Sequence, residues 1–258
     1  MEIFIFLLYN IVGDVMVITS LDNERIKNYI KLKDKKYRDE TGLFIVEGEH
    51  LVLEAYRAGI LKEIILEEDT VIPIDVPKVY VTKEIIKKIS TVLSPQPMYG
   101  ICYKVPEGKI GDKVLILDGL QDPGNVGTII RSAKAFDVDT IVLSPTTVDL
   151  YNPKVLRATQ GMAFHMNIVR CDIKDVIVSL KEKGIPIYVT KVEYGEDVRL
   201  LSDKDKVKYA LVMGNEGNGV SREIQEQADK FIYIDMNSKV ESLNVSIATS
   251  ILLYELGR

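Results

Sequence analysis

The amino-acid sequence predicts an α/β protein, with a small α/β domain followed by a larger domain built on a parallel sheet. Short apolar segments typical of buried strands alternate with helical segments from Val17 onward. In the second half the apolar segments are nearly continuous, which indicates parallel strands covered by helices on both faces. Residues 105–112 combine proline, glycine and alternating charge, so we expect a linker there between domains at 18–104 and 113–258.

The first domain is expected to begin with a helix. Asp22 is a candidate N-cap for it, because Ile26, Tyr29 and Ile30 recur at helical spacing. Gly59 is expected to end the helix predicted at His50–Ala58. The remaining elements expected, in order, are a strand at Phe44–Val46, a helix at His50–Ala58, strands at Ile64–Leu66 and Val79–Val81, a helix at Glu84–Ile89 and a strand at Tyr99–Tyr103.

The second domain shows a stricter alternation of strands and helices. The strands expected are Val114–Leu117, Thr140–Leu143, Asn167–Val169, Ile185–Val189, Tyr209–Met213 and Phe231–Ile234. The helices expected are Val126–Phe136, Lys154–Gln160, Lys174–Lys183, Ser221–Ala228 and Leu243–Leu256. Ligands of such sheets bind beyond the carboxyl ends of the strands. Functional residues are therefore expected in the loops that follow Leu117, Val189, Met213 and Ile234.

Composition and charge exclude several classes of protein. The 258 residues include two cysteines and two histidines, which rules out a disulfide scaffold and the usual zinc-ligand spacings, and predicts a cytoplasmic protein without a metal. The net charge of −5 means that any nucleic-acid binding depends on local sites. Residues 1–17 are apolar but too short to span a membrane and lack a basic start, so we expect an N-terminal extension, with Met16 a candidate start, over a targeting segment.

Three strand–loop–helix segments of the second domain carry polar motifs. The first, Asp118–Arg131, lacks the glycine spacing of a dinucleotide-binding loop, and Asn125 is its candidate helix cap, with Arg131 in the second turn. The second, Met213–Ser221, has three glycines that let the backbone approach a ligand, and it carries Glu216. In the third, Ile234–Ala248, Ser242 is the candidate cap and Asn244 follows it.

Together these motifs resemble the SpoU (TrmH-type) family of RNA ribose 2′-O-methyltransferases, in the SPOUT superfamily. The resemblance rests on D-P-G-N-V-G-x-x-x-R, G-N-E-G-x-G-x-S and E-S-L-N-V-S-x-A, and covers residues 112–258. Residues 18–104, with Phe44–Gly48, are similar to the substrate-binding domain of many members, which has the fold of ribosomal protein L30e. The resemblance implies a trefoil knot, S-adenosylmethionine (SAM) as cofactor, RNA as substrate, and a homodimer with active sites near its interface.

The resemblance also assigns site residues. The family's catalytic and invariant positions match Asn125, Arg131, Glu216, Ser242 and Asn244. Its cofactor-binding positions match Gly214, Ile234 and Leu243. We add Met213 and Met236 beside them, and Thr190 and Lys191, which follow the strand expected at Ile185–Val189. Arg157 begins a stretch, Arg-Ala-Thr-Gln-Gly, that falls where members often have Arg-Ala-Ser-x-Gly, and it is a candidate RNA contact. No histidine lies in the three loops, so the usual general base is absent.

The role of Arg131 stays open between two readings. The family proposal makes it the proton acceptor, whereas its guanidinium pKa, above about 12, favours holding a phosphate and stabilising the developing alkoxide. A local run of basic residues in the first domain is expected to contact RNA phosphates, with a solvated helix face as the alternative. Its members are Arg25, Lys27, Lys31, Lys33, Lys35, Lys36 and Arg38.

The sequence leaves alternative functions to be weighed. A non-catalytic RNA-binding protein on the same scaffold would not need Arg131 and Glu216. A dinucleotide-dependent enzyme is disfavoured by the failed glycine spacing. Within the family, rRNA is favoured over tRNA as substrate because the L30e-like domain is common in rRNA-directed members. Methylation of a base nitrogen is a further possibility in the superfamily.

Overall fold

The computed structural model describes residues 16–191 and 195–257, which form two compact units divided between Lys104 and Val105. Most of the expected N-terminal extension therefore lies outside the described residues. Val17, its last residue, instead belongs to strand β1 (Val17–Ile18), which pairs in parallel with β4 (Lys78–Val81). Across the described ranges no helix is long and apolar enough to cross a lipid bilayer.

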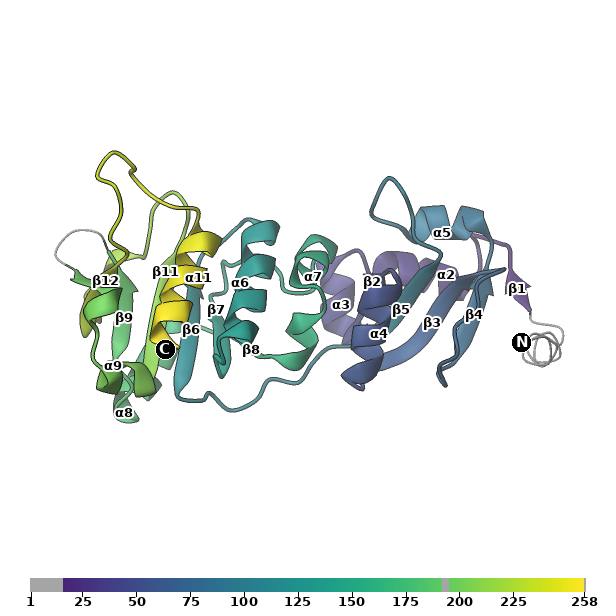
Figure 1. Ribbon diagram of the computed structural model, residues 1–258. Helices are drawn as coiled ribbons and strands as arrows, with labels where there is room; N and C mark the ends of the chain where they lie inside the picture. Colours follow the sequence, from purple (N-terminus) through teal and green to yellow (C-terminus); the bar gives the residue numbers. More distant parts are fainter. Residues whose placement is uncertain (1–15, 192–194, 258) are drawn as a thin grey trace, which may run out of the picture. The chain divides into compact units, whose positions relative to one another are not determined.

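The first unit is built on a mixed sheet in the order β1-β4-β3-β5-β2 (Figure 1). β5 (Met98–Tyr103) is antiparallel to both of its neighbours, β2 (Leu43–Glu47) and β3 (Leu61–Glu67). The core of this unit joins the sheet to its helices through side chains such as Ile26, Ile65 and Ile85, all of them fully buried. The helices are α2 (Glu24–Lys31), α3 (Lys35–Thr41), α4 (Glu49–Arg57) and α5 (Lys83–Ile89).

The basic run near the start of the chain forms two short helices. The predicted cap Asp22 is wrong, because Asn23 caps α2 by accepting a hydrogen bond from the Arg25 N–H at 2.9 Å. Asp34 caps α3 in the same way, accepting from the Lys36 N–H at 2.8 Å. The second cap interrupts the helix and directs the side chains of α2 and α3 differently.

The second unit confirms the predicted parallel sheet. Its seven strands lie in the order β10-β12-β9-β11-β6-β7-β8, and every neighbouring pair is parallel. The strands are β6 (Lys113–Asp118), β7 (Thr140–Leu143), β8 (Asn167–Arg170), β9 (Ile187–Thr190), β10 (Glu196–Asp197), β11 (Tyr209–Gly214) and β12 (Lys230–Tyr233). β9 begins two residues later than predicted, since Pro186 cannot donate to a strand ladder.

Helices cover the sheet of the second unit on both faces. Alternate strand residues such as Val114 and Val212 pack against α8 (Ile173–Glu182) and α10 (Arg222–Gln225). On the other face α6 (Pro123–Ala135) lies beside α11 (Val245–Leu256), and the Ser132 and Ser250 hydroxyls hydrogen-bond at 2.7 Å (Figure 1). The remaining helices are α7 (Pro153–Thr159) and α9 (Asp203–Val207), with 3₁₀ turns η1 (Met162–His165) and η2 (Val198–Leu200).

The strand order determines where polar loops meet. The chain runs outward from β6 to β8, then returns to the opposite side for β9, and β11 inserts between β9 and β6. The carboxyl ends of β6, β9, β11 and β12 thus come together at one edge of the sheet, the position where such folds bind ligands. The trefoil knot implied by the family resemblance stays a prediction.

The segment expected to link the domains lies against the second unit. The Val105 N–H donates to the Tyr151 hydroxyl at 3.0 Å, and the Gly108 N–H donates to Asn167 Oδ1 at 2.8 Å. Asp139 Oδ2 accepts from the Asp112 N–H at 3.0 Å. These bonds satisfy backbone donors that an extended linker would leave to water.

The contact between α6 and α7 has no room for a side chain at Gly127. A Cβ there would lie 2.3 Å from the Cβ of Ala158. We expect Gly127→Ala to lower the free energy of unfolding by about 1–3 kcal/mol, because overpacking outweighs the gain in helix propensity. Urea unfolding of the full chain measures this. Thr128→Ala, at the next and exposed position, should change it by less than about 0.5 kcal/mol. A stabilised Gly127→Ala variant would contradict the tight contact.

Candidate active site

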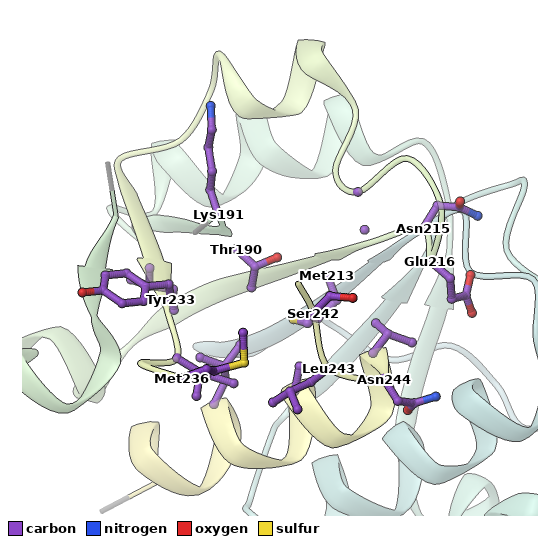
Figure 2. A pocket seen from close by; sticks show the side chains of 17 residues that line it. Thr190, Lys191, Met213, Asn215, Glu216, Tyr233, Met236, Ser242, Leu243 and Asn244 are labelled. Atoms are coloured by element: carbon purple, nitrogen blue, oxygen red, sulfur yellow. The ribbon is translucent and has the colours of Figure 1, made fainter. Parts of the chain in front are cut away.

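A pocket of about 480 Å³ opens at the carboxyl ends of the central strands of the second unit (Figure 2). Its walls come from the ends of β9, β11 and β12, from the loop after β12 and from the start of α11. The residues that line it are Thr190, Lys191, Met213, Gly214, Asn215, Glu216, Gly219, Ile232, Tyr233, Ile234, Met236, Ser242, Leu243, Asn244, Val245, Ala248 and Leu252. The cavity therefore combines an apolar floor with polar groups at its rim.

The first turn of α6, which follows the loop after β6, presents Asn125 to this rim. The predicted cap role of Asn125 is wrong, because α6 begins earlier, with Asp122 as its cap and Pro123 in its first turn. Asp122 Oδ1 accepts from the Asn125 N–H at 2.8 Å, which leaves the Asn125 side chain free of capping. Arg131 consequently lies in the third turn of α6 rather than the second.

The loop after β11 is folded back on itself by two close backbone contacts. The Asn215 N–H donates to Gly219 O at 3.0 Å, and the Gly219 N–H donates to Asn215 O at 2.9 Å. A Cβ on Gly214 would lie 2.1 Å from the Gly219 carbonyl carbon, so only glycine permits this closure. The Asn215 amide donates to Gly119 O at 2.9 Å and thereby ties this loop to the loop after β6.

The loop after β12 leads into α11 through a cap that differs from the predicted one. Asn244, not Ser242, caps α11, and its Oδ1 accepts from the Ser246 N–H at 2.9 Å and the Ile247 N–H at 3.4 Å. The same oxygen also accepts from the Ser246 hydroxyl at 2.6 Å. Ser242 is exposed at the pocket rim, two residues before the cap.

The side chain of Asn125 joins the three loops. Its Nδ2 donates to Glu216 Oε1 at 3.1 Å, and its Oδ1 accepts from Asn244 Nδ2 at 3.0 Å. Figure 2 shows Glu216 and Asn244 at one end of the pocket, with Tyr233 and Met236 at the other. Asn125 does not itself line the pocket. Through its two hydrogen bonds it orients Glu216 and Asn244 at the mouth of the cavity.

Arg131 stands apart from this network. It is exposed on α6 and does not line the pocket. Within the described residues the structure records neither a hydrogen bond nor an ion pair for its guanidinium. The five donors of an arginine without a protein partner are available to a ligand oxygen.

The predicted cofactor positions surround one cavity. Met213 and Gly214 end β11, Ile234 and Met236 follow β12, and Leu243 precedes α11 (Figure 2). Thr190 donates to Val212 O at 3.4 Å, and Lys191 Nζ lies 5.4 Å from the Phe231 ring centroid. Sequence reasoning missed seven lining residues, of which three adjoin a predicted residue: Asn215, Tyr233 and Val245, but not Gly219, Ile232, Ala248 and Leu252. No group of His, Cys, Asp and Glu side chains in the described part of the chain is arranged to hold a metal ion.

The basic run of the first unit is less exposed and less positive than its sequence indicates. The prediction that Arg38 belongs to an exposed face is wrong: it is 4% exposed and donates to Leu32 O and Lys33 O, both at 2.8 Å. Lys33 donates to two carbonyls at the C-terminal end of α5, Lys88 O at 2.8 Å and Ser90 O at 2.9 Å.

Carboxylates partly neutralise other members of this run. Arg25 pairs with Glu63 at 2.5 Å, and Lys35 pairs with Asp39 at 2.7 Å. Hydrogen bonds from Lys104 and Lys35 lower the pKa of Asp39 to about 2. Lys27 and Lys36 have acidic neighbours at 3.4 and 3.9 Å. Lys31 is exposed, with its Nζ 5.6 Å from the Tyr37 ring centroid. Arg157 is half-buried on α7 of the second unit.

Comparison with known proteins identifies the family. Residues 112–254 match the SpoU rRNA methylase family, and residues 23–100 match the MRM3-like substrate binding domain. The chain belongs to the SpoU rRNA methylase family. It is 37% identical over 246 residues to the 23S rRNA (guanosine(2553)-2′-O)-methyltransferase RlmP of Bacillus subtilis, an alignment that covers 93% of this chain and 98% of that protein.

Solved structures of similar proteins share the whole fold. The AdoMet-bound rRNA methyltransferase from Sinorhizobium meliloti is 31% identical, with a TM-score of 0.81 and coverage of 95% of this chain and 98% of the other. An RNA 2′-O ribose methyltransferase is 27% identical, with a TM-score of 0.78 and coverage of 93% and 98%. The similarity therefore extends over both units.

The cap and bridge functions of Asn244 can be separated by substitution. Asn244→Ala removes the α11 cap and should lower the free energy of unfolding by about 1–2 kcal/mol. Asn244→Asp keeps a capping oxygen and places negative charge at a helix N-terminus, so it should be close to the unaltered chain in stability. Thermal unfolding distinguishes the two. Equal destabilisation by both substitutions would show that the cap does not determine stability.

Proposed function

We propose that this chain transfers a methyl group from SAM to a ribose 2′-hydroxyl of ribosomal RNA. The observation that carries the proposal is the Asn125 amide, which joins Glu216 and Asn244 at the mouth of a 480 Å³ pocket. The three loops in that contact hold the three motifs of the family. The similarity to a named 23S rRNA 2′-O-methyltransferase, over nearly the full length of both chains, supports the substrate and the reaction.

The pocket suits SAM in size and lining. Its volume lies within the range of about 300–1,000 Å³ usual for small-molecule sites. Met213, Ile234 and Leu243 offer apolar surface to an adenine, and the Gly214 backbone lies open to a ligand. Thr190 and Ser242 supply hydroxyls, while Lys191 and Met236 complete the lining. When bound, SAM supplies an electrophilic methyl group and a neutral thioether leaving group.

The protein's own residues must orient the ribose hydroxyl and manage its proton. Glu216 is the carboxylate at the rim; Asn125 donates to it, and Asn244 in turn fixes the Asn125 amide. Arg131 is free of protein partners among the described residues, so its guanidinium can hold an RNA phosphate and stabilise the developing alkoxide. We favour this electrostatic role over proton acceptance, because a guanidinium does not lose its proton near neutral pH.

We further propose a cytoplasmic homodimer with active sites close to its interface. Ile247 and Tyr254 support a dimer, because they are 52% and 44% exposed and lie seven residues apart on one face of α11. Arg131 is on the neighbouring helix α6, outside its own chain's pocket. A second chain at this face would cover both apolar side chains.

Arg131 is the residue whose loss should separate chemistry from cofactor binding. Arg131→Ala should lower kcat by at least about 100-fold, the usual effect of removing one donor that stabilises developing charge. Its Kd for SAM should not change, because Arg131 does not line the pocket. Single-turnover methylation of 23S rRNA and calorimetric SAM titration measure the two effects.

Lys134→Ala is the matched control on the same helix, because Lys134 is also exposed. It should retain full activity. Near-normal methylation by Arg131→Ala would exclude the role assigned to this guanidinium. SAM and RNA binding by the unaltered chain with no methylation of any RNA would favour the non-catalytic alternative.

The basic run should contribute to RNA affinity without affecting the cofactor. Lys31→Glu should weaken binding of an rRNA fragment. It should also make the plot of the logarithm of the binding constant against the logarithm of salt concentration less steep, by the amount expected for the loss of about one phosphate contact. SAM affinity should be unaltered. Lys62→Glu, an exposed lysine of β3, provides the charge-matched control. The same loss in both variants would mean that only net charge matters, not this run of residues.

A further inference from the structure

An ion-pair network lies directly behind the cofactor pocket, outside the family motifs. Arg199, in η2, donates to Asp235 Oδ2 through Nη2 at 2.9 Å. The same Nη2 donates to Asp197 Oδ2 at 2.5 Å, and Arg199 Nε donates to Asp197 Oδ1 at 3.0 Å. One guanidinium thus binds two carboxylates, one from the end of β10 (Asp197) and one from the loop after β12 (Asp235).

Asp235 occupies a particular place in the pocket wall. Its neighbours in sequence, Ile234 and Met236, both line the cavity, whereas Asp235 does not. The Asp235 carboxylate accepts from Arg199 Nη2 instead of joining the lining, so it lies on the side of this segment that faces Arg199. Arg199 therefore fixes, from behind, the segment whose front surface forms the wall.

Asp197, at the other end of this ion-pair network, is held by strand pairing and by hydrogen bonds. Asp197 is 8% exposed and ends β10, which pairs with β12 through Asp197 and Tyr233. Asp197 accepts three hydrogen bonds from the Arg199 side chain and one from the Arg199 N–H at 3.0 Å. The hydrogen bonds from Arg199 hold the pKa of Asp197 below its usual range, so the carboxylate stays charged at neutral pH.

The support extends to the helix on the opposite wall of the pocket. η2 packs against α11, and Val198 beside Arg199 is 1% exposed. α11 contributes Val245, Ala248 and Leu252 to the lining. Arg199 therefore connects the pocket wall at Ile234–Met236 to η2, which packs against α11, the helix that contributes to the other wall.

We propose that Arg199 is a positioning residue for cofactor binding, which holds Asp235 so that the Ile234–Met236 segment keeps the shape that SAM requires. This inference rests on the proposed function. The pair is exposed by about half, with side-chain values of 56% and 60%, so its effect is expected to be modest. Its position behind the wall means that it preorganises the pocket without touching ligand or RNA.

Asp235→Asn is the cleanest test, because it removes charge and preserves shape. We expect it to raise the Kd and KM for SAM about three- to fivefold, as a well-formed exposed ion pair would, and to leave kcat at saturating SAM unchanged. Arg199→Met should weaken SAM binding at least as much. In the Arg199→Met background, Asp235→Asn should have no further effect.

Glu226→Gln is the matched control, since Glu226, the C-cap residue of α10, pairs with Arg222 at 3.2 Å and both residues are exposed. It should bind SAM like the unaltered chain. Wild-type affinity in Asp235→Asn would overturn the proposal, as would an undiminished effect of Asp235→Asn in the Arg199→Met background. Failure of the unaltered chain to bind SAM would instead overturn the proposed function.

Discussion

One side-chain amide holds the site together. Asn125 donates to Glu216 and accepts from Asn244, so segments 91 and 119 residues away in the sequence meet on a single group. A primary amide suits this position, because it offers a donor to the carboxylate and an acceptor to the second amide. An aspartate at this position would face Glu216 with like charge, and a leucine would leave both partners without a hydrogen bond. The mouth of the pocket depends on this contact.

Local capping chemistry makes the contact possible. Asp122 and Pro123 begin α6 early, so the Asn125 backbone is satisfied and its side chain can reach across to the other loops. Asn244 is fixed by the opposite arrangement, in which its carbonyl oxygen caps α11 and its amide nitrogen points to Asn125. The tight turn at Gly214, tied to Gly119 by Asn215, then presents Glu216 to the same point.

Much of this fold could be predicted from sequence, because near-continuous apolar strands and helical periodicity report burial directly. The first residues of the helices were harder to predict. Asp122 and Asn125 are both good caps for α6, as are Ser242 and Asn244 for α11, and only packing selects Asp122 and Asn244. The error at Arg38 has the same origin, since a charge run does not reveal which side chain turns inward. Asp235 and Arg199 carry no motif, and their meeting depends on β10 pairing with β12.

The position of the transferred methyl group tests the central claim most directly. The chain can be incubated with SAM carrying a labelled methyl group and unmodified 23S rRNA, and the digested nucleosides separated by mass spectrometry. The proposed 2′-O transfer, with Arg131 stabilising the developing alkoxide, predicts a single 2′-O-methylated nucleoside that is lost in Arg131→Ala. Label on a base nitrogen, or product formation undiminished by Arg131→Ala, would contradict the account of the site.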